Sequence, residues 1–458
     1  MKLTEHLRPA LFFLLPFALL STAFERPVVA VAPVRTVTLH LALGASVPIS
    51  PTLYGVNYDW NAIPSTMTQQ FARTMHVTAE VHTVRYPGGW NAEHYDWLNN
   101  KEQQWRHYSP IQGASPAQIL HDFSGVTFIT PSLSAITNPS MDERVATISE
   151  ALVKQYGDRV KVWEIGNEWF LQRGAKHNRQ ILQQNIDRYA ELLDVVVPRM
   201  KRANPRIRIY VAAEWNDKSD TLRLHRLTDP GVWAQIDGIA IHPYCGMTPD
   251  ESSCTTLQQR IADVRSATGK QNIYASEWAV VRSHTDDDFG IRNANFTLIA
   301  IRNLTMARVK YAAYWPPARE IPALSFVSRS LDQPYATGIV FGWMSHYYEG
   351  AALTVTGDSD AAAADDHGNV TIFVPSAEQG PERVRIELNG THLHHIVVSR
   401  VLSSGEPNDI HVSWRAHESP LPVTPTQDPH GGRYAEFILD PGTEGRGSAY
   451  EIARVTLR

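Results

Sequence analysis

The chain is poor in cysteine, in basic clusters and in long apolar runs. Only two of its 458 residues are cysteines, too few for a disulfide-scaffolded fold or a four-ligand zinc site. Lysine and arginine number 42 against 47 acidic residues, and no basic block interrupts this balance. Because nucleic-acid binding normally needs a positive footprint, we exclude a nucleic-acid partner. The apolar fraction of 43% and charged fraction of 19% are typical of globular proteins and exclude disordered, collagen-like and coiled-coil chains.

One apolar run stands out, and it lies at the N-terminus. Residues 10–20 (ALFFLLPFALL) follow a positively charged start and precede small residues at 21–23. A run of about eleven residues is too short to span a bilayer, and this order is typical of a secretory signal peptide. We predict a signal peptide within residues 1–32, a secreted or periplasmic location, and no membrane insertion after cleavage. The alternative is a buried N-terminal helix.

The two cysteines lie in one polar segment. Cys245 and Cys254 bound the sequence CGMTPDESSC. In an oxidising compartment two cysteines this close in sequence can form a disulfide that closes the loop. We therefore predict a Cys245–Cys254 disulfide, with two unrelated thiols as the alternative.

Strand-like and helix-like segments alternate through the first two thirds of the chain. Helical patterns such as those at 141–157 and 184–204 separate the strands. Alternation of this kind implies parallel strand pairing, and eight units match the size of a (β/α)₈ barrel. We predict a catalytic α/β barrel, a TIM barrel, over residues 51–335. Its strands are expected at 53–59, 81–86, 125–133, 161–167, 206–215, 237–244, 271–279 and 310–316.

The C-terminal part has a different pattern. After about residue 337 the helical pattern disappears, and short strands alternate with Gly, Pro and Asn. This is typical of an antiparallel β-sandwich, predicted as an accessory domain over 336–458. An early strand at 34–43, within residues 33–50, is expected to join it, and residues 361–366 (AAAADD) read as a hairpin tip. The other strands are predicted at 370–376, 383–389, 394–402, 409–414, 433–439 and 450–457.

Two glutamates end strands on opposite sides of the predicted barrel. Active residues of such barrels lie at the carboxyl ends of the strands. Glu168 ends the fourth strand and Glu277 the seventh, and a retaining glycosidase needs two carboxyl groups about 5–5.5 Å apart. Glu214, at the end of the fifth strand, competes for the acid role. Glu164 shares strand parity with Glu168 but lies deeper, so we expect it to be a buried partner of an arginine.

Four strand ends carry a family resemblance. Residues 163–168 (WEIGNE) resemble the strand-four signature of clan A glycoside hydrolases, and 84–89 (VRYPGG), followed by 95–97 (YDW), are similar to strand two of its α-L-arabinofuranosidases. The segments 241–244 (IHPY) and 275–278 (ASEW) resemble the ends of strands six and seven. The resemblance covers the barrel, about 53–317, and is strong for the clan because the motifs come in order.

The resemblance implies a role for each of these residues and no cofactor or metal. Glu168 would be the acid/base, with a raised pKa in the free enzyme, and Glu277 the nucleophile. Several of the other residues have plain structural alternatives: Arg85 could only neutralise Glu164, and His242, Trp315 and Trp90 could be packing residues, as could Tyr58 and Trp60. The implied substrate-binding residues are Asn167 at the sugar 2-hydroxyl, Arg85 and Tyr244 holding Glu277 ionised, His242 beside the nucleophile or the sugar, and Trp315 and Trp90 lining the subsite.

The substrate stays open within the clan. Gly166–Glu168 also resembles the β-glucuronidase and heparanase family, and the single β-domain fits the β-xylosidase and iduronidase family. Trp169 and Phe170 depart from the arabinofuranosidase pattern and suggest a large surface on the leaving-group side. We expect an exported retaining glycoside hydrolase acting on a polysaccharide or its oligosaccharides. The choice between exo-arabinofuranosidase-like and endo-acting exopolysaccharide cleavage, the sugar and the oligomeric state are left open.

Two other functions compete with this interpretation. A carbohydrate-binding protein on a degenerate barrel would keep the aromatic residues and lose a carboxylate, whereas both glutamates are present. A metallohydrolase centred on His242 would need a second histidine at a strand end, and the predicted strand ends offer none. The only partner we expect is therefore a carbohydrate substrate.

Overall fold

The structure is a computed structural model, and the part of the chain that it describes begins at Val34. The predicted signal peptide and the predicted strand at 409–414 lie outside the described residues. The described residues are 34–39, 46–81, 83–96, 101–102, 113–246, 254–281, 291–319, 325–332, 334–358, 360–375, 382–387, 396–403, 416–421, 423, 425–427, 433–439 and 452–457.

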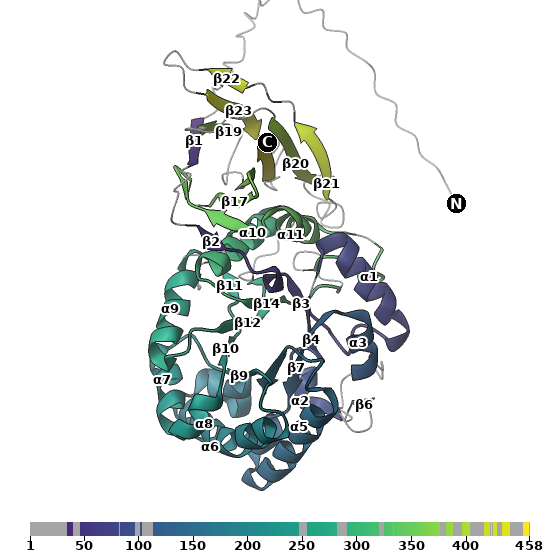
Figure 1. Cartoon of the computed structure of the whole chain (residues 1–458), viewed down its shortest axis with the longest axis vertical. Coiled ribbons are helices and arrows are strands. Elements are labelled where there is room, and N and C mark those ends of the chain that lie inside the picture. The colour runs from purple at the N-terminus through teal and green to yellow at the C-terminus, as the bar shows by residue number, and fades with distance from the viewer. Residues whose placement is uncertain are drawn as a thin grey trace, which may run out of the picture. The chain divides into compact units, whose positions relative to one another are not determined.

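Eight parallel strands close into a barrel, as the alternating pattern predicted (Figure 1). Each predicted strand is found, although the hydrogen-bonded part is shorter than the apolar run in the sequence. In order around the barrel they are β3 (Gly55–Asn57), β4 (Thr83–Tyr86), β7 (Gly125–Thr130), β8 (Val162–Ile165), β9 (Ile209–Ala212), β10 (Gly238–Ile241), β12 (Ile273–Trp278) and β14 (Tyr311–Tyr314). Nearly all their residues are buried, since helices cover the outside and side chains fill the inside.

Helices surround the strands and pack on them through one apolar face. In α6, for example, Ile186, Tyr189, Leu193 and Val197 are buried at helical spacing. Asn178 caps this helix by accepting hydrogen bonds from the amides of Gln180 and Ile181. The longer helices are α1 (Thr68–Ala79), α3 (Pro116–Asp122), α5 (Asp142–Tyr156), α6 (Arg179–Ala203), α7 (Lys218–Leu227), α8 (Pro230–Gln235), α9 (Leu257–Thr268), α10 (Ile291–Met306) and α11 (Ala336–Tyr347).

The helical pattern does not end near residue 337, and that expectation was wrong. Helix α11 runs to Tyr347 and belongs to the ring of barrel helices. Its sequence, ATGIVFGWMSHY, is apolar on nearly every side, because most of its residues are buried. A helix buried all round shows no amphipathic period, and two glycines lower its helix propensity further. The domain boundary placed at residue 336 stays a prediction.

Two mainly antiparallel sheets form the β-domain. One has the order β16-β1-β19-β23-β22 and the other β2-β15-β17-β18-β24-β20-β21. As expected, the early strand joins this system; it pairs in parallel with β19 and antiparallel with β16. The strands are β1 (Val34–Leu39), β2 (Val47–Pro48), β15 (Ala351–Leu353), β16 (Val355–Thr356), β17 (Ala362–Asp366), β18 (Asn369–Pro375), β19 (Glu382–Glu387), β20 (Ile396–Ser403), β21 (Ala416–Leu421), β22 (Pro425–Gln427), β23 (Arg433–Leu439) and β24 (Ile452–Leu457).

Strand β18 explains why this domain and the barrel pack together. Val370, Ile372 and Val374 face the core of the sandwich, whereas Phe373 belongs to the core of the barrel. The ring of Phe373 lies 6.2 Å from that of Tyr348, just after α11. A strand covered on both faces has a continuous apolar sequence. Residues 361–366 are not a hairpin tip: they lie mainly in β17, and the turn follows at His367 and Gly368, both with positive φ.

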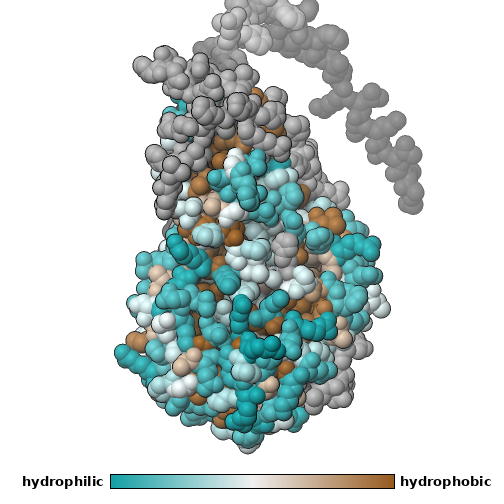
Figure 2. Space-filling view, viewed as in Figure 1, coloured by the Kyte–Doolittle hydropathy of each residue, from teal (hydrophilic) through white to brown (hydrophobic). Residues whose placement is uncertain are grey.

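The face of the molecule shown in Figure 2 is mostly polar over the described residues. In the view of Figure 2, hydrophilic residues cover most of the barrel, and hydrophobic residues show in patches between them. Among the described helices none is long and apolar enough to cross a membrane.

Candidate active site

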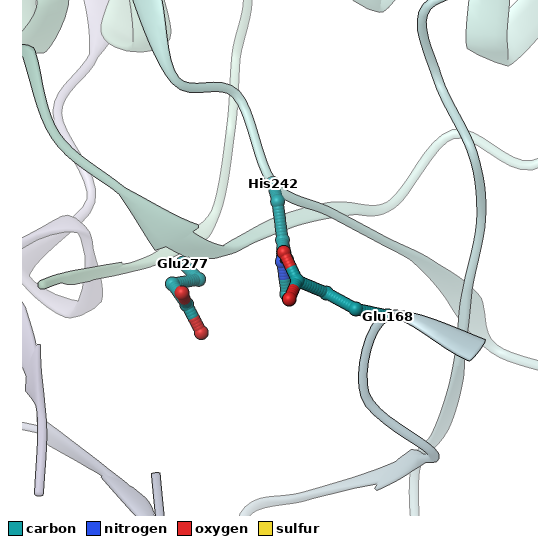
Figure 3. Close-up of side chains that lie close together, drawn as sticks. All are labelled: Glu168, His242 and Glu277. Carbon is teal, nitrogen blue, oxygen red and sulfur yellow. The ribbon is translucent and has the colours of Figure 1, made fainter. Parts of the chain in front are cut away.

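Four barrel strands bring the predicted site residues to one end of the barrel. Arg85 lies in β4 and Glu277 in β12, one residue before each strand ends. Glu168 follows β8, and His242 follows β10. The carboxyl ends of parallel strands meet at the same edge, so these side chains converge although up to 192 residues separate them. Figure 3 shows Glu168 beside His242, with Glu277 directed to the same space.

Arg85 is the centre of the buried network. Its side chain is fully buried, and its guanidinium group donates hydrogen bonds to four side chains. Burial by itself would lower the pKa of Arg85, but the charges of Glu164 and Glu277 outweigh this and raise the pKa above its ordinary value. The acceptors are Glu164 (from Nε at 2.7 Å and Nη2 at 3.0 Å), Glu277 (from Nη1, 3.0 Å), Asn57 (from Nη1, 2.8 Å) and Asn167 (from Nη2, 2.7 Å).

Both carboxylate oxygens of Glu277 accept a hydrogen bond. Arg85 Nη1 donates to Oε2, and the Tyr244 hydroxyl donates to Oε1 over 2.5 Å. The Glu277 side chain is only 8% exposed. Burial and the charge of Glu277 raise the pKa of Tyr244 well above its ordinary value, so that hydroxyl keeps its proton. A cation and a neutral donor both favour the ionised carboxylate. The geometry therefore suits a nucleophilic carboxylate.

Glu168 and His242 form a pair that shares protons. His242 Nδ1 lies 3.1 Å from Glu168 Oε1. Burial alone would raise the pKa of Glu168, but the hydrogen bond and charge of His242 outweigh it, and the pKa is lowered. Burial would likewise lower the pKa of His242, but Glu277 and Glu168 raise it. The expectation of a raised pKa for Glu168 in the free protein was thus wrong. The titration belongs to the pair, because the two groups are in direct contact.

The local backbone turns sharply between β8 and Glu168. Gly166 has a φ of 73°, and a Cβ there would lie 2.2 Å from the Ser132 hydroxyl oxygen. Glu168 itself has a φ of 46°, in the left-handed region that non-glycine residues rarely occupy. The turn aims the Glu168 side chain toward His242, and 24% of that side chain is exposed. Among the predicted pair of carboxylates, Glu168 is therefore the one open to solvent.

Asn167 has an unused donor in this site. Its side-chain oxygen accepts from Arg85, which fixes the orientation of the amide group. Its Nδ2 is buried and has no hydrogen-bond partner among the described residues. A buried donor without a partner is costly. This nitrogen is therefore suited to a hydroxyl of a bound ligand.

The two competing glutamates have other partners. Glu164 is fully buried and accepts from Arg85 and from the hydroxyl of Ser276 at 2.9 Å, as expected for a buried partner of an arginine. Glu214 accepts from the backbone amides of Asn216 and Asp217, at 2.9 and 3.1 Å. Burial raises the pKa of Glu214. Its hydrogen bonds are local to the loop after β9, whereas Glu168 faces the network.

The predicted aromatic residues fall into two groups. Trp315 is half-buried beside Tyr244, with ring centroids 6.5 Å apart, and Arg319 lies over its ring. Trp90, also half-buried, follows Gly89, where a Cβ would lie 3.2 Å from Glu277 Oε2. Tyr58 and Trp60 are buried and donate to backbone carbonyls, so they are packing residues.

Trp169 does not form a surface on the leaving-group side, contrary to expectation. It is fully buried and stacks on Tyr189, with 4.3 Å between ring centroids, because the turn after β8 directs it under α6. Phe170 is also buried and approaches His242, with 6.4 Å between rings. Both residues are therefore buried packing residues next to the site.

Sequence reasoning missed two residues that organise the site. Asn57, in β3, accepts from Arg85 and donates to the carbonyls of Ser276 and Ala313 at 3.1 and 3.0 Å. Glu93, in the short helix α2 (Asn91–His94), accepts the amide of Asn167. Asn57 lies at a predicted strand end and could have been included on that ground. No signal marks Glu93 except its place between two recognised motifs.

A disulfide joins the predicted pair of cysteines. Cys245 and Cys254 are bonded, and both are fully buried. Cys245 begins β11 (Cys245–Gly246), which pairs with β13 (Val280–Val281) beyond the end of β12. The segment directly after Tyr244 is therefore anchored beside the segment that follows Glu277.

One group of side chains has the composition of a metal site. Ligand atoms of Glu168, His242 and Glu277 lie within 4.8 Å of one another. Oxygen and imidazole ligands suit zinc. Arg85, however, already binds Glu277, and one of its nitrogens lies 3.4 Å from His242 Nε2. A dication would meet this fixed positive charge, so the residues fit a cation poorly.

Comparisons with known proteins find the same fold at low sequence identity. A family 51 α-L-arabinofuranosidase from Bifidobacterium longum is 15% identical with a TM-score of 0.64, covering 93% of this chain and 100% of that one. The GH51 arabinofuranosidase from Xanthomonas axonopodis pv. citri is 13% identical with a TM-score of 0.65, with the same coverages. A GH39 β-xylosidase from Caulobacter crescentus is 15% identical with a TM-score of 0.56, again covering 93% and 100%. No family model and no curated protein matches the chain.

These likenesses concern the fold. The chain has the overall fold of these arabinofuranosidases and this xylosidase, so the fold that the resemblance implied is confirmed. At 13–15% identity the chemistry has to be argued from the site itself.

Proposed function

We propose that this chain is an exported retaining glycoside hydrolase. Glu277 is the nucleophile and Glu168 the acid/base. The observation that carries the proposal is the position of the two carboxyl groups, whose nearest oxygens lie within 4.8 Å. Retaining enzymes hold their carboxyl groups about 5–5.5 Å apart, whereas inverting enzymes need roughly 6.5–9.5 Å to admit a water.

The first half of the reaction forms a glycosyl-enzyme. A Glu277 oxygen attacks the anomeric carbon while Glu168 protonates the leaving oxygen, and the glycosidic bond breaks. Arg85 and Tyr244 hold Glu277 charged and fixed before the attack. Asn167 Nδ2 donates to the sugar 2-hydroxyl, where hydrogen bonds strengthen in the transition state. The negative charge of Glu277 is lost when the ester forms.

The second half uses the same groups in reverse. Glu168 removes a proton from water, which attacks the anomeric carbon and releases Glu277. In the free protein the pKa of Glu168 is lowered and that of His242 is raised, so a proton held by this pair favours His242. The reactive form has a proton on Glu168; the leaving oxygen takes it in the first half, and Glu168 regains one from the attacking water in the second half.

The substrate is a polysaccharide or its oligosaccharides, with no cofactor. The half-buried Trp315 and Trp90 line the sugar subsite. Arabinofuranosidases, a xylosidase and a bifunctional glucanase-xylanase share the fold, so the first panel should hold aryl arabinofuranosides, xylosides, glucosides and glucuronides. Digestion of polymeric substrates then separates exo from endo cleavage by product length.

The decisive experiment has two parts: the anomeric configuration of the first product, and the residue that a trapped 2-fluoro sugar labels. Proton NMR of the first product should show the anomeric configuration of the substrate. A 2-fluoro sugar with an activated leaving group should accumulate on Glu277, located by peptide mapping. An inverted first product, or a label elsewhere, contradicts the mechanism. Sugar binding without turnover on every glycoside would favour a carbohydrate-binding protein instead.

Export is a separate part of the proposal. It rests on the charged, apolar and small-residue order of the first 32 residues. N-terminal sequencing of the mature protein from the periplasm or medium should begin after residue 23 or 32. Recovery of the intact chain in the cytoplasm alone would contradict it.

A further inference from the structure

Glu93 joins the segments that follow three successive barrel strands, β4, β7 and β8. It lies in α2, after β4, and accepts the backbone amides of Ser132 and Leu133 at Oε2, each over 2.7 Å. Its Oε1 accepts the Ser132 hydroxyl at 2.8 Å and the Asn167 amide at 2.7 Å. Ser132 and Leu133 follow β7, and Asn167 follows β8. One carboxylate therefore satisfies four donors from two other loops.

The turn that Glu93 holds carries the acid/base. Asn167 precedes Glu168 directly, and Glu168 has a left-handed backbone with φ 46° and ψ 32°. Such a conformation persists in a non-glycine residue only when the surroundings determine it. The amide of Gly166 donates to the Thr130 carbonyl at 2.8 Å, and the Leu171 amide donates to the Glu168 carbonyl at 2.9 Å. Between these two, the Asn167 backbone amide donates to Glu93 at 2.7 Å, while the Asn167 side-chain oxygen accepts from Arg85.

We infer that Glu93 is a positioning residue that sets the place of the Glu168 carboxyl by fixing the peptide before it. This rests on the proposed function, in which Glu168 protonates the leaving group. Glu93 touches neither carboxyl group in this structure; it acts through the Asn167 amide. Because a displacement of about 1 Å at a reacting group is costly in rate, loss of this support should weaken acid catalysis most.

The substitution Glu93→Gln tests this inference because it should remove only one of the four hydrogen bonds to Glu93, the one from the Asn167 amide. Both donors at Oε2 are backbone amides, which cannot accept a hydrogen bond. The glutamine oxygen must therefore take the Oε2 place, and its NH₂ group then faces Asn167. The Ser132 hydroxyl can reverse its role and accept, whereas the Asn167 amide cannot. The variant thus loses the bond to Asn167 and keeps those to Ser132 and Leu133.

The first measurement is the dependence of rate on the leaving group. With Glu93→Gln, kcat/KM for glycosides with poor leaving groups should fall about 10- to 100-fold, the range expected for a lost charge-assisted hydrogen bond. The loss with dinitrophenyl glycosides, which need little protonation, should be several-fold smaller. KM should change little. Equal losses for all leaving groups would overturn the inference.

A second measurement does not need turnover. Hydrogen exchange at the Asn167 amide should be at least about tenfold faster in Glu93→Gln, because that amide loses its acceptor. Glu382→Gln is the matched control: Glu382 is a buried carboxylate of the β-domain, paired with Arg35 over 3.3 Å. It should alter neither the leaving-group dependence nor exchange at Asn167.

The two measurements separate the inference from the proposed function. If the wild-type chain hydrolyses no glycoside, the proposed function fails, while unchanged exchange at Asn167 in Glu93→Gln would overturn the support from Glu93. A steeper leaving-group dependence together with faster exchange supports the inference. The same changes in Glu382→Gln would show a general loss of stability and would overturn it.

Discussion

The two halves of the site hold their carboxylates in different ways. Glu277 lies inside a barrel strand, is almost fully buried, and receives hydrogen bonds from a permanent cation and a neutral hydroxyl. Glu168 lies outside its strand on a left-handed turn, is partly exposed, and faces a titratable histidine. The donors to Glu277 are fixed, whereas the hydrogen-bond partner of Glu168 is itself titratable, and each of these two groups shifts the pKa of the other.

This difference matches the roles proposed for the two carboxylates. A nucleophile needs one charge state and one position, and a strand with Arg85 beside it supplies both. An acid/base must gain and lose a proton in every cycle, so it needs solvent access and a neighbour that can accept or donate a hydrogen bond. The turn that gives this access needs support from elsewhere, and Glu93 gives it across 74 residues of sequence.

The largest loss of activity should come from replacing the Glu277 carboxylate. Glu277→Gln keeps the shape but cannot attack, so kcat should fall by about 10⁴-fold or more. Sugar binding, measured by calorimetry, should persist, because the fold and Trp315 are unchanged. Substantial remaining activity in a preparation free of wild-type protein would assign the nucleophile elsewhere.

Replacing Glu168 should lower activity less than replacing Glu277, and the loss should depend on the leaving group. Glu168→Ala should slow glycosides with poor leaving groups by about 10²- to 10⁴-fold, and activated aryl glycosides far less. Azide should restore part of the activity by attacking the glycosyl-enzyme. Glu214→Gln is the matched control at another strand end, and it should retain most activity. The reverse pattern would make Glu214 the acid.

Removing the Tyr244 hydroxyl that donates to Glu277 should lower activity less than replacing the Glu277 carboxylate itself. Tyr244→Phe removes one charge-assisted hydrogen bond, at a cost of about 1.5–3 kcal/mol, or roughly 10- to 100-fold in kcat. Arg85 still binds the other oxygen, so activity should remain measurable. An unchanged kcat would mean that Arg85 alone fixes the nucleophile.

The pairing of Glu168 with His242 should affect how the rate depends on pH. In the wild type, the alkaline limb reports loss of the proton that the pair holds at the raised pKa of His242. In His242→Asn only the Glu168 carboxyl remains, and carboxyl groups lose protons at lower pH. The limb should therefore move toward acid, by at most roughly two pH units, the gap between ordinary histidine and glutamate values. An unmoved limb would contradict a shared proton.

The smallest effect on activity should come from the disulfide beside Tyr244. Replacing Cys245 and Cys254 by serine removes a short cross-link worth about 2–3 kcal/mol in the chain-entropy model. Thermal unfolding should begin at lower temperature, while kcat at 25 °C should change little, since β11 still pairs with β13. A large loss of kcat in the folded variant would show that the disulfide also fixes Tyr244.

Pattern reasoning located the strands and their ends well. The eight barrel strands, the early strand of the β-domain and the parity that buries Glu164 all follow from local periodicity. Helix α11 and the burial of Trp169 did not follow, because both depend on what packs around them. An apolar helix has no period to detect, and an aromatic residue after a turn can point either outward or inward.

The sequence by itself determined the barrel, the order of its strands and the two glutamates at their ends, since alternation and strand-end chemistry are local. Tertiary structure decided the charge states and the supports. His242 lowers the pKa of Glu168 instead of leaving it raised by burial. Glu93 joins segments that follow different strands, and Asn57 joins its own strand to three others. These depend on distances of about 3 Å between residues far apart in the chain, which exist only after the barrel has closed.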